Sequence, residues 1–190
     1  MSTNSRAVDI AAWAGNEAQR ALRRAGPRWA HTQAVAKQAS EIGGVVAIDD
    51  RPMLVAAAYL HDIGYATELA ETGFHPLDGA MWLRTQGLER LAGLVAHHSG
   101  ARFEAAARGY AEPLAAFAEE RSAVADALTY CDLTTGPNGE RISVASRLDE
   151  IKVRYGPASP VTQAINAATD TLGAAVARTL ARMDGLAPPG

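Results

Sequence analysis

The apolar residues of this chain recur at the three- and four-residue spacing of amphipathic helices, and this spacing predicts an all-α fold. Residues 53–60 are apolar on every side, which predicts a central, buried helix. The helix at 159–184 has the clearest signals, because Ser159 is a suitable N-cap and Pro160 suits the first helical position. Its apolar stripe is predicted to face the core and consists of Val161, Ile165, Ala168, Leu172, Val176, Leu180 and Met183.

Glycine and proline residues divide the rest of the chain into further helices. Pro27 and Pro76 suit first helical turns, and Gly87 suits a helix end. The predicted helices cover residues 8–24, 27–42, 51–62, 76–86, 88–98 and 124–132. Short helices and turns are predicted for 101–119, and a loop for 134–139.

The composition limits the number of domains and the kinds of partner. With 190 residues, 48% of them apolar, the chain can build one domain with a core, and we expect a single domain over 1–190. The net charge of −3 and the mixing of charge signs leave no basic stripe for nucleic acid. The single cysteine, Cys131, fits a reducing compartment. Without a recognisable signal peptide or membrane-length apolar run, we expect a cytoplasmic protein that does not bind membranes.

Histidine and aspartate residues follow one another in an order that suggests a metal site. Several of them fall at predicted helix ends, where backbone carbonyls and the helix dipole favour a cation. Imidazole and carboxylate together suit iron, manganese or zinc, and seven ligands exceed the need of one ion, so two ions that share a ligand are the natural interpretation. The predicted ligands are His31, His61, Asp62, His75, His97, His98 and Asp132.

Each of these residues also has an interpretation without metal. A lone His31 on an amphipathic helix is commonly a half-buried histidine with its hydrogen bonds satisfied, and His75 before a proline could cap a helix. Of the adjacent pair His97 and His98, one residue usually faces water. Asp62 is more telling, because an ionised carboxylate among Leu, Val and Ala is costly to bury without a cation or donors. The joint occurrence of all seven favours the metal site.

The same residues resemble the HD-domain superfamily of metal-dependent phosphohydrolases. The resemblance covers roughly residues 25–135 and rests on the segments Arg28-Trp29-Ala30-His31-Thr32, Tyr59-Leu60-His61-Asp62-Ile63-Gly64, His75-Pro76-Leu77-Asp78-Gly79, His97-His98 and Asp132. The order is similar to the binuclear branch, which includes HD-GYP phosphodiesterases and HD-type dinucleoside polyphosphate hydrolases. The resemblance implies a single-domain HD-type helical bundle with a metal-binding core at about 25–135. Beyond it, we expect C-terminal helices at about 143–184.

The resemblance also implies how the ligands are divided between two ions. One ion is expected on His31, His61, Asp62 and Asp132, and Asp62 is expected to bridge to a second ion on His75, His97 and His98. Two features depart from the HD-GYP pattern. Tyr65 stands where those proteins have a lysine, and the extended block after the paired histidines is missing, which argues against a cyclic-dinucleotide role.

The predicted reaction is hydrolysis of a phosphate ester of a small nucleotide or related metabolite by a metal-activated hydroxide, with Asp62 and Arg28 as catalytic residues. Iron or manganese is expected as the divalent ion, with zinc, nickel, cobalt or magnesium as further options. Arg102 is a second candidate for phosphate contact, whereas Arg141, Arg147 and Lys152 are expected at the surface. The alternatives are a di-iron oxygenase of the same ligand set and a non-catalytic nucleotide-sensing module. The expected partner is a small-molecule phosphate, with a nucleotide favoured, and we expect the chain to be a monomer or homodimer.

Overall fold

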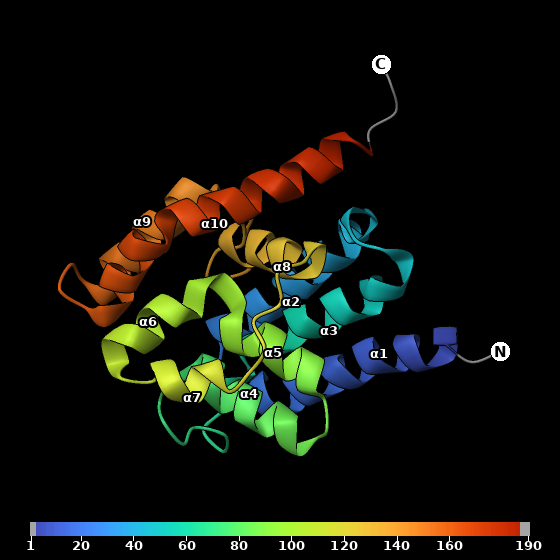
Figure 1. Cartoon of the computed structure of the whole chain (residues 1–190), viewed down its shortest axis with the longest axis horizontal. Coiled ribbons are helices and arrows are strands. Elements are labelled where there is room, and N and C mark those ends of the chain that lie inside the picture. Colours follow the sequence, from blue (N-terminus) through green and yellow to red (C-terminus); the bar gives the residue numbers. More distant parts are fainter. Residues whose placement is uncertain (1–2, 187–190) are drawn as a thin grey trace.

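The computed structural model of this chain describes residues 3–186, which fold into helices without a β-strand and so confirm the all-α prediction (Figure 1). No helix among these residues has both the length and the apolarity needed to cross a membrane. The α-helices are α1 (Thr3–Leu22), α2 (Pro27–Glu41), α3 (Arg51–Leu60), α4 (His75–Thr85), α5 (Glu89–His97), α6 (Ala101–Arg108), α7 (Ala111–Ala115), α8 (Ala123–Leu133), α9 (Val144–Tyr155) and α10 (Pro160–Asp184).

Helix α3 is the centre of the core, as its uniformly apolar sequence predicts. It packs against α1, α2, α5 and α8. Leu54, Ala56, Ala57, Ala58 and Leu60 are fully buried, and these small side chains allow the neighbouring helices to approach closely. The end of α3 therefore lies deep inside the molecule, surrounded by residues from four other helices.

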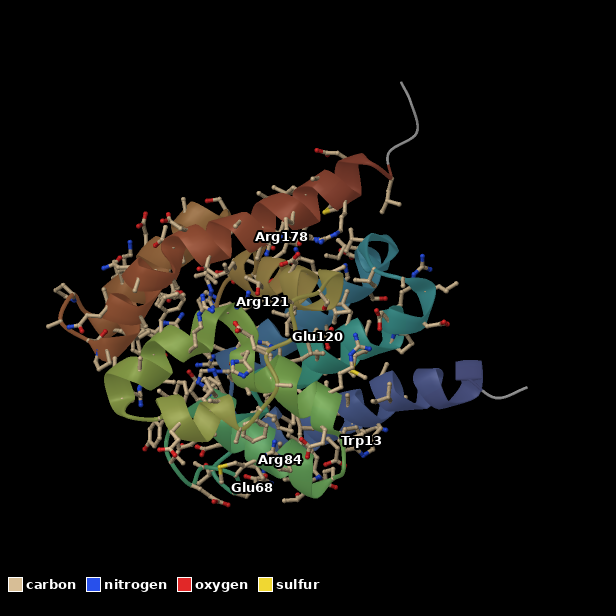
Figure 2. The ribbon with its side chains drawn as sticks, viewed as in Figure 1. Trp13, Glu68, Arg84, Glu120, Arg121 and Arg178 are labelled. Carbon is tan, nitrogen blue, oxygen red and sulfur yellow. The ribbon has the colours of Figure 1, made fainter. Side chains whose placement is uncertain are left out.

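Helix α1 packs mainly against α3, with Ala14, Ala18 and Leu22 fully buried, and a pair of tryptophans also joins it to α4. The rings of Trp13 on α1 and Trp82 on α4 stack with their centroids 5.8 Å apart and their planes 6° from parallel. Trp13 lies at the lower side of the molecule in Figure 2, away from α10.

Helix α10 crosses the opposite side of the molecule, over α8 and α6 (Figure 1). Its N-terminus is as predicted, because Ser159 accepts a hydrogen bond from the amide of Thr162. The predicted apolar stripe is wrong at Leu180, whose side chain is 42% exposed. The residues of α10 that are buried are Thr162, Ala164, Ala168, Leu172, Ala175 and Thr179.

An ion-pair cluster joins α10 to α8. Arg178 contacts Asp126 at 2.6 Å and Arg182 contacts it at 2.9 Å, so both guanidinium groups share one largely buried carboxylate. Figure 2 shows Arg178 between the two helices. This cluster and the apolar contacts of Leu172 with Leu133 hold α10 in place.

Candidate metal centre

Imidazole and carboxylate groups from five parts of the chain converge at the end of α3. His31 lies on α2, His61 and Asp62 directly follow α3, and Asp132 lies on α8. Ligand atoms of His31, His61 and Asp62 all lie within 4.8 Å of one another. A second group with the same spacing consists of Asp62, His75 at the start of α4 and His98 directly after α5. Asp62 belongs to both groups, so its two oxygens face two sets of histidines.

Backbone carbonyls determine how three of these histidines present their rings. Nδ1 of His31 contacts the carbonyl of Gly136 at 3.0 Å, Nδ1 of His61 contacts Ala58 at 2.8 Å, and Nδ1 of His98 contacts Val95 at 2.6 Å. Because a carbonyl only accepts, each Nδ1 carries the proton and donates it. In a neutral ring the other nitrogen, Nε2, then has a free lone pair, and all three Nε2 atoms face the cluster.

The environment of His61 tests whether a cation fits. Its ring is completely buried, and Nε2 has no hydrogen-bond partner in the described part of the chain. Burial is the largest influence on this ring and lowers the pKa of His61, which keeps it neutral despite the charges of Asp62 and Asp132. The closest charged oxygen is Oδ2 of Asp62 at 3.5 Å, so a lone pair faces a carboxylate. A cation between them resolves this repulsion, and the donor set therefore fits a divalent metal.

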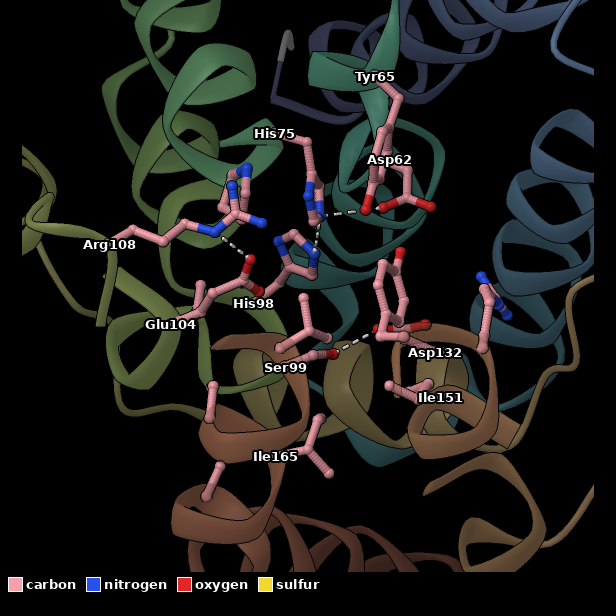
Figure 3. Close-up of a pocket in the computed structure, with 18 of the residues that line it drawn as sticks. Asp62, Tyr65, His75, His98, Ser99, Glu104, Arg108, Asp132, Ile151 and Ile165 are labelled. Carbon is pink, nitrogen blue, oxygen red and sulfur yellow. Dashed lines mark hydrogen bonds and ion pairs between the residues drawn. The ribbon is translucent and has the colours of Figure 1, made fainter. Parts of the chain in front are cut away.

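The second group has the same electrostatic character. Nε2 of His75 lies 3.3 Å from Oδ1 of Asp62 and 3.4 Å from Nε2 of His98 (Figure 3). Burial lowers the pKa of His75 well below its usual value. Burial alone would raise the pKa of Asp62, but its surroundings, in which the Arg28 guanidinium is the permanent positive charge, hold it well below its usual range. The centre therefore combines neutral imidazoles with an ionised carboxylate.

Arg28 extends this centre through a three-layer stack. Its Nη1 donates to Oδ2 of Asp62 at 2.6 Å, and its guanidinium lies 3.8 Å above the ring of Tyr65. Tyr65 in turn stacks on His75, with ring centroids 4.0 Å apart. Burial and the charge of Asp62 raise the pKa of Tyr65, so its hydroxyl keeps its proton and can act as a donor. The structure thus places the predicted residue Arg28 directly beside the cluster.

Asp132 has two partners that the sequence analysis did not predict. Its Oδ1 lies 3.1 Å from Nε2 of His31 and 3.6 Å from Nη2 of Arg147, and its Oδ2 accepts a hydrogen bond of 2.5 Å from Ser99. The prediction that Arg147 is at the surface is wrong, because only 5% of it is exposed. Its Nη1 also donates to Glu150 one turn further along α9, which compensates part of its charge. No local pattern in the sequence distinguishes this arginine from an exposed one.

Two predicted site residues are not brought to the cluster. His97 turns away, and its Nε2 donates to the carbonyl of Phe117 at 2.9 Å. Arg102 is exposed and pairs with Glu119 at 3.2 Å, on the same side as His97. Adjacent positions 97 and 98 point in different directions because the helix ends there, so this structure does not bring His97 to the other predicted ligands or Arg102 to the cavity beside them.

The position of His75 depends on two residues whose roles the sequence analysis did not identify. Asp78 is buried and accepts hydrogen bonds from the amides of Thr72 at 2.8 Å and Gly73 at 3.1 Å, which fixes the loop before His75. A Cβ at Gly64 would lie 2.1 Å from the carbonyl oxygen of His75. Only glycine therefore allows the segment after Asp62 to pack against the start of α4.

A cavity of about 180 Å³ opens onto the cluster (Figure 3). Asp62, His75, His98 and Asp132 belong to its lining, and Figure 3 shows Ile151 and Ile165 below Asp132 and His98, away from Asp62 and His75. The arginines in its lining are Arg28, Arg108, Arg147 and Arg154. Each of these arginines also pairs with a carboxylate, which is Asp62, Glu104, Asp132 or Glu150. The cavity thus joins the candidate metal centre to guanidinium groups that are suited to bind an oxyanion.

The comparison with known proteins agrees with this geometry. A family model described as HD domain matches residues 28–135, the segment that contains all the converging histidines and aspartates. No curated protein and no solved structure matches the chain. Because the family model covers more than half of the sequence, this chain belongs to the HD domain family.

Proposed function

We propose that the protein is a metal-dependent phosphohydrolase that cleaves a phosphate ester of a small metabolite. HD domains are generally hydrolases that bind divalent metals, which supports the reaction class. The observation that carries the proposal is the convergence of histidine Nε2 lone pairs on Asp62, next to a cavity lined by four arginines. Neutral imidazoles and carboxylates are suited to the metal, and guanidinium groups are suited to phosphate.

The proposal assigns the ions to the two groups described above. His31, His61, Asp62 and Asp132 would hold one ion, and Asp62, His75 and His98 a second. Iron or manganese is the preferred metal for this mixed set of nitrogen and oxygen ligands. When bound, a pair of divalent ions neutralises phosphate oxygens and lowers the pKa of water.

The protein's own groups then perform the binding and the orientation. Arg28 fixes the rotamer of Asp62 through its 2.6 Å ion pair and presents the rest of its guanidinium to the cavity. Arg154 is partly exposed at the cavity and would attract the phosphate dianion from solvent. Tyr65 lines the cavity and is the candidate donor to the leaving oxygen, at the position where HD-GYP proteins have a lysine.

The test combines elemental analysis with a phosphatase screen. We expect protein purified without added metal to retain iron or manganese and to hydrolyse p-nitrophenyl phosphate and a panel of phosphate monoesters, nucleotides included. Asp62→Asn should lose both the metal and the hydrolysis while its circular dichroism stays helical. Full activity of this variant would contradict the proposal.

The same screen separates hydrolysis from oxygen chemistry and from a binding role. We expect turnover to persist without oxygen and with a redox-inert metal such as zinc or magnesium. A requirement for oxygen would indicate the di-iron alternative. Metal and phosphate binding without turnover of any ester would indicate a sensing module.

A further inference from the structure

The far side of the metal cavity is built by a part of the chain outside the HD domain match. The family model ends at residue 135, whereas α9 and α10 cover 144–184. These two helices contribute Arg147, Arg154 and Tyr155 to the cavity lining together with five apolar residues. We call the five residues the apolar wall, which consists of Ile151, Val161, Ala164, Ile165 and Ala168.

The apolar wall lies across the cavity from the candidate ligands Asp62 and His75. Figure 3 shows Ile151 and Ile165 facing the space below His98 and Asp132, while Asp62 and His75 lie at its other end. A phosphate bound at the ligands would therefore direct its organic group toward the apolar wall. Burial of apolar atoms against such a wall is favourable, and a polar organic group would lose hydrogen bonds to water there.

The cavity also limits the size of that group. Pockets for drug-sized ligands occupy about 300–1,000 Å³. The cavity here measures about 180 Å³, and part of this space is needed for the phosphate. The remaining space suits a short hydrocarbon group better than a nucleoside.

A buried arginine in the lining lacks a partner for one of its donors. Arg147 is 5% exposed, and its Nε has no hydrogen-bond partner among the described residues. Its other nitrogens contact Glu150 and Asp132. This Nε has almost no accessible surface, so it does not reach the cavity, and Arg147 instead joins α9 to the candidate ligand Asp132.

From the apolar wall and the volume of the cavity, we infer that α9 and α10 form a subsite for the organic group, and that the preferred substrate is a compact phosphate monoester with a short apolar chain. This inference rests on the proposed hydrolase function and narrows its substrate class. This substrate class excludes nucleotides, because the base and sugar of a nucleotide are larger and more polar than a short apolar chain.

Alkyl phosphonates test the subsite without requiring turnover. We would measure the binding of methyl-, ethyl-, propyl- and hexylphosphonate to the manganese-loaded protein by calorimetry. Each buried methylene should tighten binding by about fourfold from methyl to propyl, and hexyl should bind no better than propyl because it exceeds the cavity. Equal affinities across the series would overturn the inference.

Two substitutions on one helix provide a matched control. Ile151 belongs to the apolar wall, whereas Val153 is 85% exposed on the same helix. Ile151→Asn should abolish the dependence on chain length, and Val153→Asn should leave it intact. Ile165→Asn serves as a second wall variant from α10 should Ile151→Asn fail to fold. Loss of the dependence in Val153→Asn would contradict the assignment.

Rates then distinguish failure of the subsite from failure of the proposed function. We expect kcat/KM for propyl phosphate to exceed that for adenosine 5′-monophosphate by at least about tenfold, which corresponds to burial of two methylenes or more. A preference for the nucleotide would overturn the inference and leave the hydrolase proposal standing. A graded phosphonate series without hydrolysis of any ester would support the subsite and refute the hydrolase proposal.

Discussion

Ser99 donates a hydrogen bond of 2.5 Å to Oδ2 of Asp132 from a left-handed backbone conformation with a φ of 47°. Residues other than glycine rarely adopt this conformation, which costs about 1 kcal/mol or more. The turn that follows α5 is therefore strained at Ser99, and this strained conformation places the Ser99 hydroxyl where it orients a candidate metal ligand. The adjacent Gly100 adopts the same region with a φ of 74°, so the chain turns sharply between His98 and α6.

Two substitutions at Ser99 should separate strain from ligand orientation. Ser99→Ala keeps the strain and removes the hydroxyl, so its unfolding free energy should fall by about 1–2 kcal/mol. Ser99→Gly relieves the strain and should be more stable than Ser99→Ala. Both variants should lose about 10- to 100-fold in metal affinity, because an outer-shell partner of a ligand is missing. Chemical denaturation and metal titration measure the two effects, and unchanged metal affinity in both variants would contradict this role.

The adjacent histidines His97 and His98 provide the sharpest test of the ligand set. His98→Gln should reduce the metal content per chain, because Nε2 of His98 faces Asp62 and His75. His97→Gln should retain the wild-type metal content and lose only about 1 kcal/mol of stability with its hydrogen bond to Phe117. Elemental analysis of the two variants checks the prediction. Equal loss of metal from both would show that the ring of His97 turns inward when metal is bound.

Gly64 and Gly173 should respond to alanine with opposite signs. At Gly64 a Cβ would collide with the backbone of His75 at 2.1 Å and of Gly79 at 2.7 Å, so Gly64→Ala should destabilise the fold by about 3 kcal/mol or more and displace His75. At Gly173, in the middle of α10, a Cβ meets nothing within 4 Å. Gly173→Ala should therefore stabilise the protein by about 0.5–1 kcal/mol. Thermal unfolding of both variants measures the difference.

The attachment of α10 should weaken in acid through Asp126. Burial raises the pKa of this carboxyl, but the hydrogen bonds from Arg178 and Arg182 outweigh burial and lower it below its ordinary value. A lowered pKa in the folded state means that the contribution is complete above about pH 4 and is lost as the pH falls through the folded-state pKa. The arginines are partly exposed, and we expect about 1 kcal/mol at neutral pH after solvent screening.

Asp126→Asn tests this contribution. Its unfolding free energy should lie below that of the wild-type protein at pH 7, and the difference should shrink as the pH falls below 4. Lys37, whose exposed ion pair with Glu41 lies far from α10 in the sequence, provides a control, because Lys37→Gln should have little effect at any pH. A difference for Asp126→Asn that grows in acid would contradict the assigned sign.

Local sequence determined most of the helices and the identity of the chemistry-bearing residues. The spacing of apolar residues predicted α3 as the central helix, and Ser159 with Pro160 predicted the start of α10, because periodicity and capping involve residues within a few positions of one another. The order of histidines and aspartates along the chain likewise predicted membership of the HD domain family, which the family match confirms.

The tertiary structure alone decided which side chains meet. His97 and His98 are adjacent, yet their rings have different partners. The ring of His97 donates to the carbonyl of Phe117, 20 positions away, whereas the ring of His98 faces Asp62 and His75. Arg147 and Ser99 contact Asp132 from elements far apart in the chain. Leu180 is exposed because the small residues of α10 are the ones that pack against α8. The direction of a side chain at a helix end depends on such distant partners, which no local spacing encodes.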